Sequence, residues 1–221
     1  MSYEGHRCPI CHGRERGKTL EVIVIIVLII SIVFLINLGI TQQNNAGKFT
    51  RVNEDTIEYG KTKLVIPELE LQIHTLINNY RQSKGLHALA FDPKLTAIAR
   101  EHSKDMADRN FFAHESPEGK DPTARGKQVG YTCHKELGGG RYSEGIAENI
   151  SQNSLYNSYT KTTISIRYDW KTTEELAQST VLGWIASTGH RQNILTPTYD
   201  REGIGVAVAT DNKVYITEDF C

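Results

Sequence analysis

The feature that most constrains this chain is a run of nineteen uncharged residues at 22–40 (VIVIIVLIISIVFLINLGI). Only Ser31 and Asn37 in this run are polar. As a helix that rises about 1.5 Å per residue, the run is about 28 Å long, which matches the hydrocarbon thickness of a bilayer. We therefore predict a single transmembrane helix over residues 20–40.

A cleaved signal peptide is the alternative explanation of this run. The apolar core of a signal peptide usually has about 7–15 residues, and a small-x-small cleavage site follows it. The run at 22–40 is longer, and the polar stretch that begins at Thr41 contains no such site. The sequence therefore favours an uncleaved anchor.

The cations on either side of the run predict its orientation. Four cations precede it and two follow it: Arg7, Arg14, Arg16 and Lys18, then Lys48 and Arg51. Positive charge is enriched in the cytoplasmic flanks of membrane spans. We therefore expect a single-pass protein of the cell membrane, with a cytoplasmic N-terminus and an extracytoplasmic C-terminal part.

The four cysteines divide evenly between the two sides of this predicted membrane span. Cys133 and Cys221 fall on the outer side, where a disulfide can persist, and they are the candidate pair. A bridge between them would fasten the last strand to the loop after residue 131. Cys8 and Cys11 fall on the inner side, where thiols stay reduced.

The inner tail contains a Cys-x-x-Cys pair that resembles one knuckle of a zinc ribbon. Cys8 and Cys11 could bind zinc, with His6 or His12 completing the ligands. All four groups lie within seven residues, which would strain a tetrahedral site. The alternatives are a disordered tail and a metal shared by two chains.

Composition excludes two broad classes of protein and helps to divide the chain. The 25 basic and 26 acidic side chains nearly cancel and form no long basic run, which argues against a nucleic-acid partner. The 39% hydrophobic content, together with the 18 glycines, excludes wholesale disorder. We expect a polar tail at 1–19, a solvated stalk without apolar periodicity at 41–63 and one folded domain at 64–221.

The pattern of apolar residues in this domain predicts an α+β layered fold. Three helices are signalled by Pro67 with a stop at Gly85, by an Asp92 cap with Pro93, and by a capping box of Thr172 and Glu175. Alternating residues at 204–208 and a second run from 214 predict a hairpin, and 145–150 is a candidate central strand. Helices at both ends with strands between and after them indicate packed layers.

Two further features of the domain have a structural and a functional interpretation. Residues 152–171 are rich in aromatic side chains, which either form a contact surface or cover the sheet from an edge strand at 162–168. The edge strand is the favoured reading. His102 lies on the apolar face of its predicted helix, so we expect a hydrogen-bonded core residue there.

Taken in order, six segments of the domain resemble the CAP or SCP superfamily (cysteine-rich secretory protein, antigen 5 and pathogenesis-related 1), and its short prokaryotic members in particular. The segments are 77–81 (INNYR), 111–116 (FFAHES), 147–150 (AENI), 183–195 (GWIASTGHRQNIL), 203–206 (GIGV) and 215–220 (YITEDF). The resemblance covers about residues 67–221. It implies an α-β-α sandwich with an open cleft between helices and sheet.

The resemblance also implies a set of cleft residues. His114, Glu148 and His190 match two histidines and one of two glutamates that can hold a divalent metal such as zinc in better studied members. Ser187 occupies the place of the second glutamate and would line the cleft. Without that carboxylate, Glu148 is the remaining candidate for a catalytic base unless it binds the metal, and the histidines can equally be hydrogen-bonded structural residues.

Three functions follow from this sequence. The leading hypothesis is a membrane-anchored binding module at the cell surface, whose cleft holds a small ligand, a metal ion or a cell-surface polymer. The first alternative is a metal-assisted hydrolase of peptide or cell-envelope substrates that uses His114, His190 and Glu148. The second alternative is a structural or adhesion module, in which the aromatic segment matters more than the cleft. A CAP-type fold alone does not choose among them.

Overall fold

The computed structural model describes residues 29–31 and 49–221. Residues 29–31 are helical, and the rest of the predicted membrane helix lies outside the described residues, as do Cys8 and Cys11. In the described parts of the chain, each helix is too short or too polar to cross a lipid bilayer. Residues 46–221 make one compact unit, and the description below concerns that unit.

A four-stranded sheet forms the centre of the unit. Its strand order is β4 (Ala90–Phe91), β10 (Arg201–Val208), β11 (Lys213–Phe220) and β7 (Ala147–Ser154). β10, β11 and β7 are antiparallel, whereas the short β4 is parallel to β10. The predicted C-terminal hairpin is confirmed as β10–β11. The candidate central strand is present as β7, but it lies at an edge of the sheet and not at its centre.

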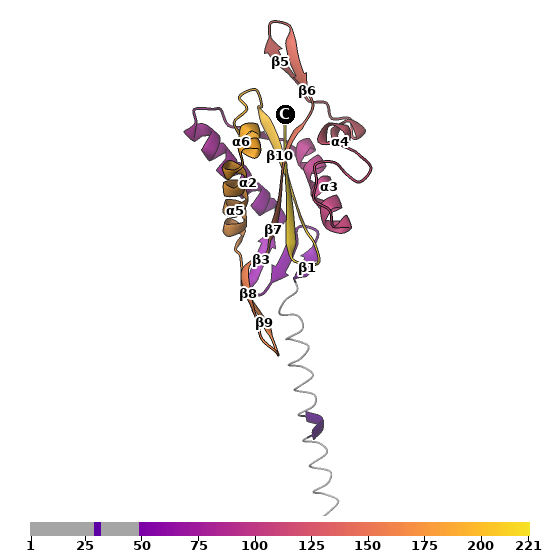
Figure 1. Cartoon of the computed structure of the whole chain (residues 1–221), viewed down its shortest axis with the longest axis vertical. Coiled ribbons are helices and arrows are strands. Elements are labelled where there is room, and N and C mark those ends of the chain that lie inside the picture. Colours follow the sequence, from indigo (N-terminus) through magenta and orange to yellow (C-terminus); the bar gives the residue numbers. More distant parts are fainter. Residues whose placement is uncertain (1–28, 32–48) are drawn as a thin grey trace, which may run out of the picture. The chain divides into compact units, whose positions relative to one another are not determined.

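Helices cover both faces of this sheet, which gives three layers (Figure 1). α3 (Pro93–Arg109) packs on one face, and α2 (Ile66–Ser83) and α5 (Thr173–Ala186) pack on the other. All three helices were expected from their start signals. The Asp92 side chain accepts hydrogen bonds from the first turn of α3, and Thr172 and Glu175 form a capping box at α5. Two short helices, α4 (Pro122–Gln128) and α6 (Thr188–Ile194), complete the layers.

Two glycines allow α3 to approach the sheet closely. A Cβ atom on Gly203 would lie 2.2 Å from the backbone of Leu95, and one on Gly205 would lie 2.1 Å from the backbone nitrogen of Arg100. Real Cβ atoms do not approach backbone atoms so closely. The alternation of glycine with Ile204 and Val206 therefore has a cause: small residues face α3 and apolar residues face α2.

The folded unit begins earlier in the chain than we expected. Strands β1 (Thr50–Asn53), β2 (Thr56–Tyr59) and β3 (Thr62–Val65) form an antiparallel sheet within the predicted stalk. Ile57, Tyr59 and Leu64 from this sheet are fully buried in the main hydrophobic core. The stalk prediction is therefore wrong for residues 50–63. The sequence did not reveal these strands because each is too short to show a clear alternation of apolar and polar residues.

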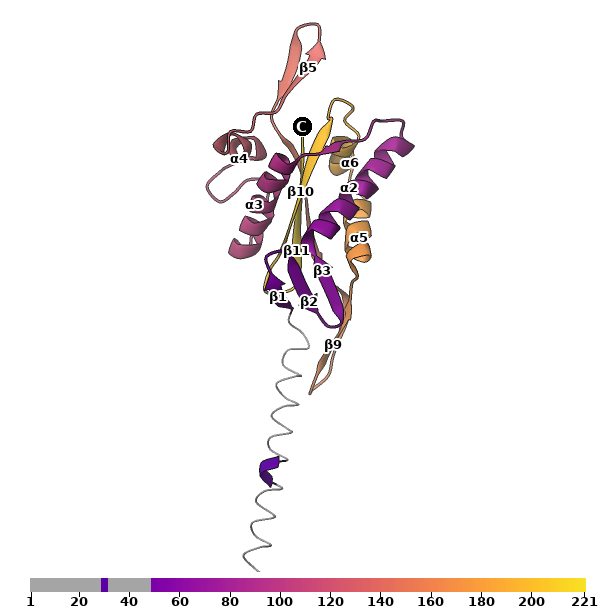
Figure 2. The same cartoon turned by 180° about the vertical axis from the view of Figure 1, so that it is seen from behind.

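Two hairpins extend from opposite ends of the unit (Figures 1 and 2). One consists of β5 (His134–Gly138) and β6 (Arg141–Glu144), and the other of β8 (Tyr156–Lys161) and β9 (Ile166–Trp170). The β8–β9 hairpin forms its own two-stranded sheet. It is not an edge strand of the central sheet, so the favoured interpretation of residues 162–168 is wrong.

The predicted disulfide between Cys133 and Cys221 is present. It joins the segment before β5 to the residue after β11, and its Cα atoms are 5.5 Å apart. Both cysteines are buried in a small cluster with Leu95, Ile98 and Ile146. The bridge therefore fastens the end of the central sheet beside the α3 layer.

Candidate functional site

His114 and Glu148 form the first pair of the site. Glu148 is a buried residue of β7, and its Oε1 atom lies 2.7 Å from Nδ1 of His114, in the segment between α3 and α4. Because a carboxylate only accepts, Nδ1 carries the proton in the neutral imidazole. The Nε2 atom of His114 is then left with a free lone pair. Glu148 thus fixes both the orientation and the tautomer of this histidine.

The second oxygen of Glu148 is also occupied. Arg125 of α4 donates from Nη2 to Oε2 of Glu148, and it donates from Nη1 to the His114 carbonyl at 2.7 Å. The Arg125 side chain is only 11% exposed, so this is a buried ion pair. One cation therefore holds both the carboxylate and the backbone of the segment that carries His114.

His102 lies behind this pair, as a core residue. Its Nε2 atom donates to the Ala113 carbonyl at 2.9 Å and lies 3.9 Å from Oε2 of Glu148. Burial lowers the pKa of His102, although the charge of Glu148 acts in the opposite direction. The ring is therefore neutral. Its Nδ1 atom is buried and has no hydrogen-bond partner among the described residues.

A second buried carboxyl lies beside Glu148 on the same face of the sheet. Asp219 of β11 is paired in register with Glu148, and it is fully buried. Burial and the neighbouring charge of Glu148 raise the pKa of Asp219 well above its usual range. Burial therefore favours the protonated form of Asp219, and Arg125 is the cation that pairs with Glu148.

His190 reaches the site from α6 on the other side of β7. Asn193 of the same helix donates to the Glu148 carbonyl at 3.1 Å and to Oδ1 of Asn149 at 2.9 Å. Asn149 in turn donates to the His190 carbonyl at 3.2 Å. These bonds fix α6 against β7 and so place His190.

Side-chain hydrogen bonds also hold the turn between α5 and α6. Ser187 is the residue between the end of α5 and the start of α6. Arg191 donates to the carbonyls of Ile185 and Ala186 at the end of α5, at 2.6 and 3.4 Å. Arg191 therefore ties α6 to the end of α5, whereas the His190 ring has no hydrogen-bond partner among the described residues.

His114 and His190 open onto the same cavity, which has a volume of about 480 Å³. Its wall is apolar at Phe112, Ile150 and Trp184 and polar at Gln152, Thr180 and Ser187. Burial and the nearby His114 lower the pKa of His190. The cavity thus combines an apolar wall with two imidazoles, which is the usual composition of a small-molecule site.

A larger cavity of about 690 Å³ lies between α3 and α4, and most of its charged side chains are already paired. Its charged side chains are largely paired with each other: Lys104 with Asp108, and Arg109 with both Asp105 and Glu118. These five side chains are therefore less available to a ligand than an unpaired group. The smaller cavity, with an unpaired imidazole, is the better candidate.

The predicted site residues are therefore brought together in an unexpected arrangement. The structure places His114, His190 and Ser187 on one cavity wall, but Glu148 does not line this cavity. Both oxygens of Glu148 are bonded to protein groups. Among the described residues, no group of three or more histidine, cysteine, aspartate or glutamate side chains is arranged to hold a metal ion.

The group that the sequence interpretation missed is Arg125. It lies 23 residues before Glu148, in a helix of seven residues, and no local pattern connects the two. Only the strong burial of a glutamate on a strand would have indicated that a cation must lie nearby.

Comparison with known proteins identifies the family of this chain. The model of the cysteine-rich secretory protein family, CAP, matches residues 74–220. The uncharacterized protein YkwD of Bacillus subtilis (strain 168) is 31% identical over 163 residues, which cover 74% of this chain and 52% of YkwD. The uncharacterized membrane protein YlbC of the same organism is 27% identical over 160 residues, covering 72% of this chain and 36% of YlbC. The chain therefore spans about half of the first relative and about a third of the second.

A solved structure shows the same fold. An extracellular protein from Bacillus anthracis str. Ames that contains an SCP domain superimposes with a TM-score of 0.51 and 25% sequence identity, over 77% of this chain and 44% of that protein. The family match includes His114, Glu148 and His190, together with the strands and helices that position them. The chain belongs to the CAP, or cysteine-rich secretory protein, family.

Proposed function

We propose that this protein is a cell-surface binding module whose cleft engages its ligand through His114 and His190. One observation carries the proposal: two imidazoles open onto one cavity, and the ring of His190 has no hydrogen-bond partner among the described residues. Glu148 leaves the Nε2 atom of His114 free as an acceptor. Two imidazoles can bind a metal ion or accept hydrogen bonds from a polar ligand.

A divalent metal such as zinc is the first ligand to test. The imidazole nitrogens are suitable donors, and a buried carboxylate behind a ligating histidine is the usual support for such a ligand. The chain would supply His114 and His190, with Glu148 orienting His114. Two protein ligands leave half of a tetrahedral shell to water or to a second ligand, so we expect moderate affinity.

Calorimetric titration of residues 46–221 with zinc tests the proposal. We expect binding in the micromolar range that is lost in the His114→Ala/His190→Ala double variant. His134→Ala is the matched control. It removes an exposed imidazole of the β5–β6 hairpin that is paired with Glu136 and does not line the cavity. Equal binding by all three proteins would overturn the metal proposal, and ligands that contact the imidazoles directly would then be screened.

Ser187→Glu sharpens the same experiment. Ser187 lines the cavity with both histidines. A carboxylate there would supply a third ligand, which is the number that open zinc sites commonly have. We expect at least about a tenfold gain in zinc affinity from an added anionic ligand. An unchanged affinity would place Ser187 out of reach of the bound ion.

The position of the chain at the cell surface is part of the proposal. The uncharged run at 22–40 supports a membrane anchor, and one relative is named a membrane protein. The disulfide and the likeness to a protein named extracellular support an outer location for the folded unit. Protease accessibility of the folded unit in intact cells tests this orientation.

A hydrolase is the second candidate, because the Glu148–His114 pair has the geometry of an oriented general base. A buried carboxylate at Nδ1 leaves Nε2 free to take a proton from water. If the domain hydrolyses peptides of the cell envelope, we expect Glu148→Gln and His114→Ala to abolish product formation. His190→Ala would separate the alternatives, since it should affect a metal-assisted step and spare a metal-independent one.

A further inference from the structure

The tip of the β8–β9 hairpin exposes apolar side chains to solvent. We define this tip as residues 162–166. Ile164 is 82% exposed, which is the largest value for a large hydrophobic side chain among the described residues, and Ile166 is 39% exposed. Two isoleucines at the end of a projecting hairpin contribute nothing to the core. They indicate contact with another apolar surface.

An aromatic strip leads from this tip towards the body of the domain. Tyr168 and Trp170 are stacked with ring centroids 4.7 Å apart, and Tyr159 lies 5.9 Å from Tyr168. Tyr156 packs edge-on against Tyr168 at 5.0 Å. Trp170 also closes over Gly60, where a Cβ atom would lie 2.5 Å from the indole. The strip is therefore a packed surface, and tyrosine and tryptophan are the residues that favour the headgroup layer of a bilayer.

Three backbone amides of the tip donate hydrogen bonds within the tip itself. The Thr162 amide donates to the Ser165 carbonyl at 2.8 Å. The amides of Ser165 and Ile164 donate to Oγ1 of Thr162 at 3.0 and 3.4 Å. Unpaired amides are the main cost of moving a loop out of water. This turn can therefore leave water at a lower cost than an open loop.

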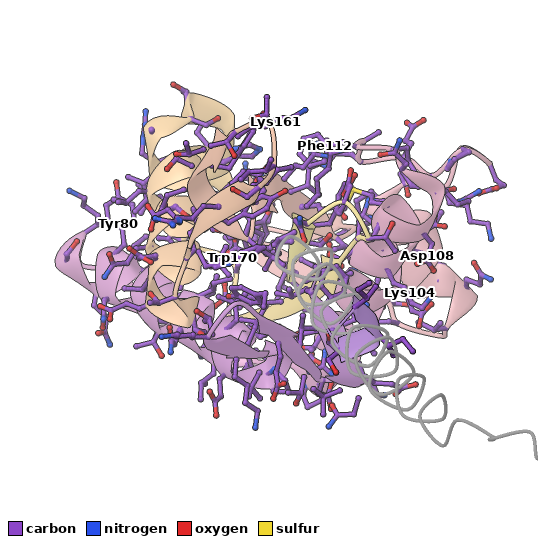
Figure 3. The ribbon with its side chains drawn as sticks, turned by 90° about the horizontal axis from the view of Figure 1, so that it is seen from below. Tyr80, Lys104, Asp108, Phe112, Lys161 and Trp170 are labelled. Atoms are coloured by element: carbon purple, nitrogen blue, oxygen red, sulfur yellow. A yellow bond between two sulfur atoms is a disulfide. The ribbon has the colours of Figure 1, made fainter. Side chains whose placement is uncertain are left out.

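The hairpin lies at the end of the unit where the chain enters it. β1, the first strand of the unit, lies at the same end as the β8–β9 tip in both views (Figures 1 and 2). Figure 3, which looks at this end, shows Lys161 and Trp170 on the hairpin. Nine peptide steps separate Ile40 from Phe49. They reach at most about 30 Å, so an anchor at 22–40 would keep this end near the membrane.

Two basic residues directly beside the tip match an anionic lipid surface. Lys161 is paired in register with Ile166, and Arg167 is paired with Thr160. Each cation close to an anionic leaflet adds attraction. Asp169 of β9 leaves the β8–β9 hairpin with two cations and one acid. The β5–β6 hairpin at the opposite end differs, because its exposed Glu136 and Glu144 outnumber its exposed Arg141 and both contact His134.

We propose that the β8–β9 tip inserts into the headgroup layer of the membrane that anchors the chain and so fixes the orientation of the cleft. This inference rests on the proposed membrane anchor. The partner is the surface of a bilayer that contains anionic phospholipid, with Ile164 as the deepest residue and the aromatic strip at headgroup level.

The test uses the full chain reconstituted into vesicles of phosphatidylcholine and phosphatidylglycerol. Ile164→Trp places a fluorophore at the tip, and Tyr142→Trp places one on the β5–β6 hairpin, where Tyr142 is also exposed. The wild-type protein measured in parallel gives the emission of Trp170 and Trp184. Flotation of the vesicles reports the anchor, and quenching by lipids with brominated acyl chains reports the depth of the tip.

We expect all three proteins to float and only the tryptophan at position 164 to be quenched, by about twofold or more, because an inserted interfacial segment reaches about 5–10 Å into the boundary with the acyl chains. A chain that floats with equal quenching at both positions, or with none at 164, overturns the insertion while the anchor stands. A chain that does not float overturns both.

Discussion

The two faces of the central sheet are held by different means. Towards α2 and α5, twenty buried apolar residues form one continuous cluster. Towards α3, the buried apolar residues form two clusters of five and three. The poorer face is held instead by close backbone approach at Gly203 and Gly205, by the disulfide and by polar contacts such as Ser103 to the Gly205 carbonyl at 2.8 Å. The face with the smaller core is also the face that carries Glu148.

The buried acids on the two faces of the sheet also have different partners. Glu148 is balanced by Arg125 in an ion pair. On the other face, Glu202 and Glu218 are fully buried and interact with each other. Glu202 also lies 2.5 Å from Nδ1 of His74, and Glu218 accepts a hydrogen bond from Asn149 at 2.9 Å. Burial raises the pKa of both acids, and the charge of Glu202 raises that of Glu218 further. Glu148 therefore has a cation as its direct partner, whereas burial favours the protonated forms of Glu202 and Glu218.

The largest expected effect breaks the α3 layer. Gly205→Val would put a side chain 2.1 Å from the backbone of α3, so the helix has to move away from the sheet. We expect a loss of more than about 4 kcal/mol in the free energy of unfolding, or no folded protein. Gly183→Ala is the control, because nothing lies within 4 Å of a Cβ atom there. Urea denaturation compares the two, and equal stability would contradict the close packing.

Removal of the disulfide should have the next largest effect. Cys133 and Cys221 are separated by 88 residues. Opening a loop of this size costs about 4 kcal/mol, mainly because the unfolded chain gains freedom. We expect the Cys133→Ser/Cys221→Ser variant to unfold at lower urea concentration, with protection lost first in α3. Hydrogen exchange that opens both helical layers together would contradict the separation of the two faces.

Arg125→Met tests whether the charge of Glu148 needs its cation. A buried carboxylate left without a partner costs about 3 kcal/mol. We expect that loss in urea denaturation, and we expect the Arg125→Met/Glu148→Gln double variant to recover most of it. Failure of the double variant to recover would mean that Arg125 acts through the His114 carbonyl, and not through the ion pair.

The smallest expected effect is a change with pH in the free energy of unfolding, caused by Glu218 on the face of the sheet that packs against α2 and α5. An acid whose folded pKa lies above its unfolded value of about 4.5 contributes stability that is complete below that pH and is lost as the pH rises through the folded pKa. We expect the wild-type protein to lose stability relative to Glu218→Gln above pH 5, by up to about 1.4 kcal/mol per pH unit. Burial lowers the pKa of His74 in both proteins, and Glu218→Gln lowers it further by removing the charge of Glu218, so His74 stays neutral above pH 7 in both. If the two curves of unfolding free energy against pH are parallel, Glu218 is ionised in the folded protein.

Local features of the sequence predicted the local features of the fold. Asp92 and the Thr172–Glu175 pair mark helix starts because a cap involves residues only three positions apart. The hairpin at 201–220 is equally local. The order of strands is not, so the edge position of β7 had no signature. β1–β3 were missed because their four-residue strands bury too few side chains to show a period.

The candidate site depends on contacts between distant segments, so residue patterns alone could not assemble it. His114, Glu148 and His190 were connected only through the resemblance to a family. Even then the roles were incomplete, because the two oxygens of Glu148 could not be assigned without Arg125. The sequence gives the type of each residue. It does not show here which buried charge contacts which partner.

The place of β11 in the sheet has a consequence for biosynthesis. β11 lies between β10 and β7, although both of these strands are made before it. The two halves of the sheet therefore cannot join until residues 213–220 have emerged from the ribosome or from a translocation channel. During that interval the nascent chain exposes apolar strand edges to chaperones and proteases. A message that stops before Lys213 should yield a rapidly degraded polypeptide rather than a smaller domain.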